Sequence, residues 1–171
     1  MRLLCLSALL ALGTVTIVSA KGMTTRIVIT GPQLSEPIEL RDRALVAPFN
    51  VWSGPGTRSN GVEGMDGFIA DWRTGSVQPP AENIQQFEIS FYVDGGSAGE
   101  ERMAYVVSYA FDPQTGEGYV YLPGRGDARW GPNVRSILRG ANYEGHWFRA
   151  TAAWQNVMRT YVISRAERRQ P

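Results

Sequence analysis

The chain has 171 residues, with seventeen Lys and Arg, sixteen Asp and Glu, one His and one Cys. A single cysteine excludes an intramolecular disulfide, and a single histidine excludes a histidine-rich zinc site. The near-balanced charge does not favour nonspecific nucleic-acid binding, so no nucleic-acid partner is expected. No motif predicts a cofactor, a metal site or a catalytic set.

Residues 1–20 have the pattern of a cleavable secretory signal: a positive start and an uncharged, leucine-rich run over 3–18. Val18-Ser19-Ala20 presents small residues for cleavage after Ala20, which predicts a secreted or periplasmic mature chain. Cys5 leaves with the signal. The apolar run approaches the roughly 20 residues that span a bilayer, so an uncleaved anchor is the alternative. Residues 21–171 are expected to form one exported domain.

The first half of the mature chain predicts short strands separated by loops. The β-branched residues of 26–30 favour a strand, and 37–40 supplies a short partner. Residues 41–50 predict a helical turn capped by Asp42. A glycine-rich loop covers 53–67, and the aromatic run at 68–72 predicts another strand.

The middle of the chain carries the clearest pattern. Residues 86–94 alternate apolar and polar side chains, as in a strand with one buried face. Residues 104–111 are apolar on both faces, which is typical of a central strand. The turn at 112–118 and the run at 119–122 complete a predicted hairpin.

The C-terminal part predicts a strand at 133–138 and one amphipathic helix. The apolar positions of the helix recur at spacings of three and four, in the order Trp147, Ala150, Trp154, Val157, Met158 and Tyr161. The predicted fold class is therefore α+β: a mostly antiparallel meandering sheet packed by one C-terminal amphipathic helix.

Three tryptophans next to loops, Trp52, Trp72 and Trp130, are the candidate ligand-binding residues. Exposed rings beside Gly, Asn and Arg can stack on the faces of sugars. The alternative is that each ring plugs the edge of the core.

An alternative function is a secreted hydrolase that uses the carboxylates of Glu63, Asp66 and Asp71 with His146. Paired carboxylates perform acid/base hydrolysis, and the only histidine would be the neutral-pH base, oriented by Glu144. The chain lacks a nucleophile-elbow motif, and solvated loop acids explain the same residues.

Charge divides unevenly along the mature chain. Residues 21–124 carry seven basic and thirteen acidic side chains, whereas 125–171 carry nine arginines against three acids. Arg165, Arg168 and Arg169 at the end of the helix are candidates for weak contact with an anionic surface. The other arginines are expected to pair with the acidic part.

Two segments, Phe49-Asn50-Val51-Trp52-Ser53-Gly54-Pro55-Gly56-Thr57 and Gly118-Tyr119-Val120-Tyr121-Leu122-Pro123-Gly124, resemble small exported bacterial proteins of unknown function. This resemblance implies bacterial origin and export, and it assigns no site residue. The sequence predicts an exported, non-enzymatic binding or interaction domain with a protein or glycan partner outside the cytosol. An inhibitor of a secreted enzyme, with 123–131 as its protruding loop, is a further alternative.

Overall fold

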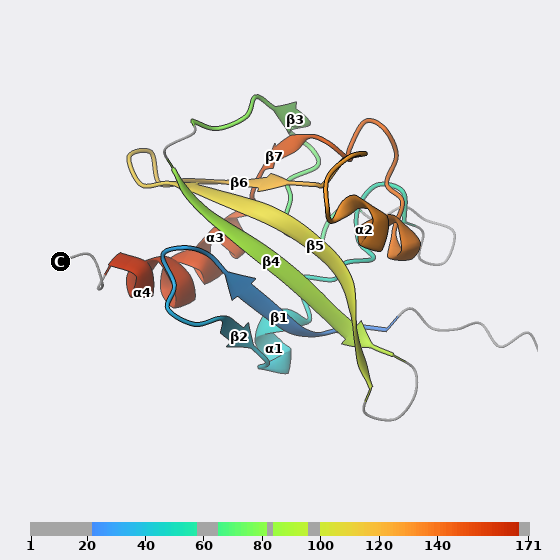
Figure 1. Ribbon diagram of the computed structural model, residues 1–171, viewed down its shortest axis with the longest axis horizontal. Coiled ribbons are helices and arrows are strands. Elements are labelled where there is room, and N and C mark those ends of the chain that lie inside the picture. Colours follow the sequence, from blue (N-terminus) through green and yellow to red (C-terminus); the bar gives the residue numbers. More distant parts are fainter. Residues whose placement is uncertain (1–21, 58–64, 82–83, 96–99, 168–171) are drawn as a thin grey trace, which may run out of the picture.

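The computed structural model describes residues 22–57, 65–81, 84–95 and 100–167. The predicted signal, its cleavage site at Ala20, and the site candidates Glu63, Arg168 and Arg169 lie outside these residues. Within them, the chain forms a seven-stranded antiparallel sheet with a C-terminal helix, which confirms the α+β class (Figure 1). No helix in the described ranges has the length and apolar content needed to cross a membrane.

The strand order in the sheet is β2-β1-β4-β5-β6-β7-β3. The strands are β1 (Thr24–Thr30), β2 (Ile38–Leu40), β3 (Ser76–Val77), β4 (Gln85–Asp94), β5 (Glu101–Asp112), β6 (Glu117–Tyr121) and β7 (Trp147–Arg149). The helical segments are α1 (Arg43–Val46), α2 (Trp130–Ser136), α3 (Ala152–Met158), the π-helical η1 (Arg159–Ile163) and α4 (Ser164–Glu167).

The N-terminal elements follow the sequence pattern. β1 and β2 pair in antiparallel register, with Ile27 opposite Leu40 and Ile29 opposite Ile38, and all four side chains are buried. The Asp42 carboxylate then accepts a hydrogen bond from the Ala44 amide at 2.9 Å and begins α1, as predicted. This cap ends the β1–β2 ladder, because it turns the chain away from the sheet.

β4 and β5 lie in the middle of the sheet, and β5 contains the central strand predicted at 104–111. The apolar side chains of β4, namely Phe87, Ile89, Phe91 and Val93, are buried on the inner face and alternate with partly exposed polar ones. β5 lies between β4 and β6, and the predicted hairpin connects it to β6. The alternation places Glu88, Ser90 and Tyr92 on the outer face.

The strand predicted at 133–138 is wrong, because these residues belong largely to α2. Pro132 is the third residue of this helix, in the first turn, where its missing N–H costs nothing. β6 pairs with β5 only from Ser108 onward, so an edge of β5 is left without a strand. The buried Asn133 amide bonds both main-chain groups of Val106, at 2.8 and 2.6 Å, in place of a strand.

The strand predicted at 68–72 is also wrong: this segment contributes one isolated bridge, between Ala70 and Ala150. The Asp71 side chain accepts a hydrogen bond from the Arg73 amide at 3.0 Å and forms a turn that ends the extended run. The segment is nevertheless in the core, since Phe68, Ile69 and Trp72 are buried along with Ala70.

The predicted C-terminal helix is confirmed, but it begins later than its apolar stripe. Trp147 lies on β7, and the Thr151 hydroxyl caps α3 by accepting from the Trp154 amide at 3.3 Å. The π-helical segment then rotates the stripe by one position, which leaves Tyr161 36 % exposed and buries Val162 instead. Figure 1 shows this helix against one face of the sheet, where Trp154 packs on Phe49 and Phe91.

Candidate functional site

A cleft of about 510 Å³ lies where β1 begins and where β4 and β5 meet. The described residues that line it are Thr25, Arg41, Asp94, Glu100 and Glu101. All five are hydrophilic, and four carry a charge. We call this hollow the charged cleft.

A second hollow of about 300 Å³ lies between the start of β1 and α1. Its described lining residues are Met23, Thr24, Thr25, Arg43, Ala47 and Asp94. Because Thr25 and Asp94 line both hollows, the two are neighbours around the first residues of β1. We call the second one the edge hollow.

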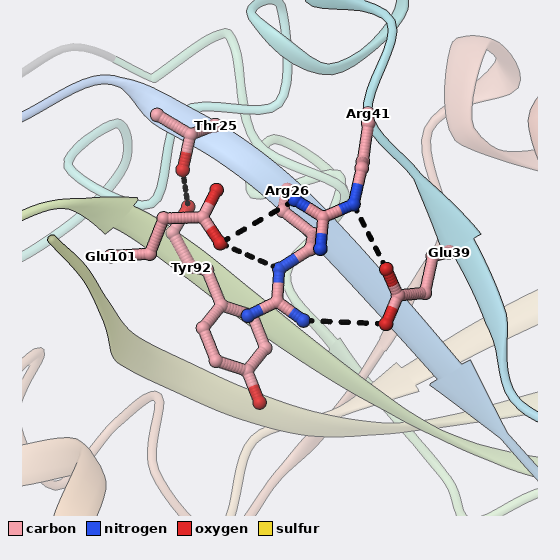
Figure 2. A network of polar contacts seen from close by, with 6 residues as sticks. All are labelled: Thr25, Arg26, Glu39, Arg41, Tyr92 and Glu101. Atoms are coloured by element: carbon pink, nitrogen blue, oxygen red, sulfur yellow. Dashed lines mark hydrogen bonds and ion pairs between the residues drawn. The ribbon is translucent and has the colours of Figure 1, made fainter. Parts of the chain in front are cut away.

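A network of ion pairs adjoins the charged cleft through two of its lining residues, Arg41 and Glu101, and we call this network the wall (Figure 2). Arg26 points out of the sheet, and its Nε donates to Glu101 Oε2 at 2.7 Å while its Nη1 donates to Glu39 Oε1 at 3.4 Å. Arg41 donates from its Nε to Glu39 Oε2 at 2.9 Å, and its Nη1 lies 3.7 Å from Glu101 Oε2. The two guanidinium groups and two carboxylates thus join β1, β2 and β5.

The strand register brings these groups together. Arg26 is paired with Tyr92 across β1 and β4, and its guanidinium lies 3.7 Å from the centre of the Tyr92 ring. Glu101 is the first residue of β5 and pairs with Asp94, so its side chain reaches Arg26 across the end of β4. The wall is therefore fixed by three strands rather than by a loop.

The electrostatics of Glu101 reflect this arrangement. Partial burial acts to raise the pKa of Glu101. Hydrogen bonding from Arg26 and Thr25 and the positive charges of Arg26 and Arg41 together outweigh that effect and hold the pKa below its ordinary value. Glu101 is accordingly ionised at neutral pH and acts as an anchor for the two arginines, which leaves no proton there for general-acid catalysis.

The charged cleft offers both signs of charge to a ligand. Asp94, Glu100 and Glu101 supply carboxylates, while Arg41 supplies a guanidinium whose side chain is 57 % exposed. Arg43, in the edge hollow, adds a second exposed cation. In the described residues no group of three or more His, Cys, Asp or Glu could hold a metal ion. The geometry suits binding of a ligand with both charges.

None of the sequence-predicted site residues that the structure describes is among the described lining residues of the charged cleft. The strand register was readable from the alternation in β1 and β4, but the contribution of Glu101 depends on where β5 begins. Arg26 and Glu101 are 75 residues apart in the sequence, so no pattern among neighbouring residues could indicate that they form a pair.

The predicted tryptophan site is not assembled as one surface. Trp52 is half-buried: its indole N–H donates to the Gly22 carbonyl at 2.8 Å, and Arg102 lies 5.8 Å from the ring centre. Trp130 begins α2, where Arg125 lies 5.8 Å from its ring centre. These two rings keep partial exposure, and their role in binding stays a prediction.

The expectation of an exposed ring at Trp72 is wrong, because its side chain is in the core and only 5 % exposed. The ring stacks on Phe68 with centres 5.9 Å apart and also packs against Phe148 and Tyr143. It plugs the core, which is the alternative that the sequence left open.

Arg139 is buried beside Trp72 and was missed by sequence reasoning. Only 4 % exposed, it donates to the carbonyls of Val51, Ser53 and Pro55 at 2.7 to 3.0 Å. Its guanidinium lies 4.9 to 5.2 Å from the ring centres of three aromatic side chains, Phe68, Trp72 and Tyr105. Burial lowers the pKa of Arg139, and the nearby Tyr105 and Glu144 act against that shift. This side chain fixes the loop that follows α1.

The residues proposed for hydrolysis have other structural partners. Asp66 forms a two-oxygen ion pair with Arg73, at 2.9 and 3.0 Å, and Asp71 caps the turn at Arg73. Glu144 does not orient the exposed His146, because its carboxylate accepts from the main-chain amides of Arg139 and Gly140. Glu63 lies outside the described residues. Acid/base hydrolysis by this set stays a prediction.

The arginine-rich part of the chain pairs in part with the acidic part. Arg129 forms two hydrogen bonds to Glu88, at 3.0 and 3.1 Å, and Arg149 forms an ion pair with Glu117. Arg165 lies at a small hollow beside residues 33–38. These contacts do not test whether Arg165 binds anions together with Arg168 and Arg169, so that role stays a prediction.

The predicted protruding loop at 123–131 is braced from within. The Asp127 carboxylate accepts from the Tyr121 hydroxyl and from the Gly124 amide, both at 2.7 Å.

Comparisons with protein-family models, curated proteins and solved structures gave no match. The function therefore has to be inferred from the geometry alone.

Proposed function

We propose that this protein is an exported, non-enzymatic binding domain that takes a polar segment of a partner protein in the charged cleft. The observation that carries the proposal is the cleft of about 510 Å³, whose lining combines three carboxylates with an exposed guanidinium. Its volume is within the range of about 300 to 1,000 Å³ that is usual for ligand sites. Export rests on the predicted signal at residues 1–20.

A peptide segment fits the cleft chemistry because it can carry both charges at once. A basic side chain would be attracted to Asp94 and Glu100, and an acidic one to Arg41, whose guanidinium forms planar paired hydrogen bonds with carboxylates. The ion pair between Arg26 and Glu101 is neutralised within itself and presents a fixed boundary. Arg41 bonds Glu39 through its Nε, but its side chain stays 57 % exposed and can take a second carboxylate.

A protein partner is favoured over a glycan at this site because none of its described lining residues is aromatic. Tyr92 is the aromatic residue of the wall, and the guanidinium of Arg26 covers its ring at 3.7 Å. Stacking on sugars needs an uncovered ring. Trp72 is unavailable as well, since it is buried.

Binding rather than general-acid hydrolysis is favoured by the electrostatics of Glu101. A general acid needs a pKa near the working pH, whereas the pKa of Glu101 is held below its ordinary value. The cleft also lacks a histidine among its described lining residues.

The test is peptide binding measured by fluorescence polarisation at low and high salt. Mixed-charge peptides are expected to bind, and neutral oligosaccharides are not. Arg41→Ala and Glu100→Gln should each weaken binding by about fivefold, the worth of one exposed ion pair of about 1 kcal/mol. Arg135→Ala, an exposed arginine on α2, is the matched control and should change nothing. Equal loss in the control and the cleft variants would refute the site.

A further inference from the structure

The ladder between β1 and β2 is shorter than β1 itself. β2 pairs with Ile27, Val28 and Ile29, and its last residue, Leu40, lies opposite Ile27. In continued register Arg41 would lie opposite Arg26, but Asp42 begins α1 and the chain leaves the sheet. Thr24, Thr25 and Arg26 therefore have β4 on one side and no strand among the described residues on the other.

The edge hollow lies along this part of β1. It is lined by Thr24 and Thr25 from the strand and by Arg43 and Ala47 from α1, so it separates the strand edge from the helix. Three residues of strand span about 10 Å, which matches three residues of an added segment. Met23, 48 % exposed, supplies an apolar contact at the end of the hollow.

The edge of β5 beyond the end of β6 also lacks a paired strand among the described residues, but it is covered. Where β6 stops, the main chain of Val106 is bonded by the side-chain amide of Asn133, and α2 covers the edge. Proteins commonly cover or shorten such edges, because unpaired main-chain groups recruit other strands. Among the described residues, Thr25 has no paired strand on the side of the hollow, while the neighbouring Thr24 is buried and its hydroxyl donates to the Phe49 carbonyl at 2.9 Å.

We propose that an extended segment of the partner protein adds to the sheet as a strand along Thr24, Thr25 and Arg26. This inference rests on the proposed function and specifies how the partner segment binds. Main-chain hydrogen bonds to β1 would provide the affinity, as in other cases of strand addition. Charge complementarity determines which end of the segment lies where. An acidic side chain of the segment lies at Arg41 and Arg43, and a basic one lies at Asp94 and Glu100.

The test uses an acetylated hexapeptide library with Asp at one end, Lys at the other and four randomised residues. The tightest binder is then remade with alternate main-chain nitrogens methylated, which removes strand hydrogen bonds and keeps the side chains. Methylation should weaken binding by about tenfold or more, the worth of about one to two hydrogen bonds. The peptide should also slow amide exchange within Thr24, Thr25 and Arg26, with Val28, paired on both sides, as the reference.

A second pair of variants tests the hollow without touching a charge. Ala47→Trp fills the edge hollow and should abolish binding, whereas Ala153→Trp, at an exposed position of α3, should not. Circular dichroism of both variants checks that each is folded.

The outcomes separate the mode from the function. If the methylated peptide binds as well as the parent, and Arg41→Ala still weakens both, strand addition is overturned and the charged cleft stands. If no library member binds with a Kd below about 1 mM, both proposals fail. If the protein self-associates and the same amides are protected without peptide, the edge binds a second copy of this chain. That result would overturn the proposal of a partner protein.

Discussion

Arg139→Met is the substitution that most sharply tests how the core and the loop after α1 are held together. The arginine donates to three main-chain carbonyls, those of Val51, Ser53 and Pro55. Methionine has a similar length but no donor, so these carbonyls lose their partner. Each unpaired buried polar group costs about 1 to 3 kcal/mol.

An opposing contribution reduces the net effect. Burying a guanidinium carries a desolvation penalty, which the substitution relieves. The Ser53 carbonyl is only partly buried and can bond water. Two buried carbonyls, those of Val51 and Pro55, are left unpaired at a cost of about 2 to 6 kcal/mol in total, and the relieved desolvation offsets part of it. We therefore expect the free energy of unfolding to fall by about 3 kcal/mol.

Urea denaturation at neutral pH, followed by tryptophan fluorescence, measures this change. Arg135→Met on α2 is the control, since that arginine is exposed, and it should change stability by less than about 0.5 kcal/mol. Arg139→Lys should fall between the two, because one ammonium cannot span three acceptors in the planar arrangement of a guanidinium. A loss below about 1 kcal/mol for Arg139→Met would refute the reasoning.

Three further predictions follow from the contacts. Asn133→Ala leaves the buried N–H and C=O of Val106 unpaired and should destabilise by about 2 to 4 kcal/mol in the same assay; an unchanged value would mean that water replaces the amide. Trp154→Ala removes a fully buried ring and should cost about 3 to 5 kcal/mol, whereas less than about 1 kcal/mol would place the ring outside the core. The pKa of Glu101 is lowered on folding, so its contribution is present above the ordinary pKa of 4.5 and lost as the pH falls below it. Glu101→Gln should therefore differ in stability from wild type by under about 1 kcal/mol at neutral pH, because the pair with Arg26 is partly exposed to solvent. This difference should vanish as the protein is titrated to acid pH, and a difference that grows in acid would contradict the sign.

The sequence predicted those parts of the fold in which one local signal dominates. The alternation in β4 and the cap at Asp42 each specify an element without reference to the rest of the chain. The helix at 130–136 was missed because the residue that explains it, Asn133, acts on the distant strand β5. The start of the C-terminal helix was placed too early because apolar spacing outweighed the cap at Thr151.

The candidate site could not be predicted for the same reason. Its wall joins Arg26 to Glu39 over 13 residues and to Glu101 over 75 residues, and none of these side chains stands out in its own neighbourhood. The tryptophans were more conspicuous, yet a large ring is as well suited to filling a core as to binding a ligand, and Trp72 does the former. The charge division predicted pairs between the C-terminal arginines and the acidic part, such as Arg129 with Glu88, whereas the pairs of the wall lie within the acidic part itself.

The central claim is that a partner segment binds in the charged cleft. The most direct measurement is a titration of nitrogen-labelled protein with the tightest mixed-charge hexapeptide, followed by amide chemical shifts. The account predicts shifts concentrated at Thr25, Arg41, Asp94 and Glu101, which weaken with salt and disappear in Arg41→Ala. Shifts centred instead on Trp130 or Arg165, with the cleft amides unmoved, would contradict it.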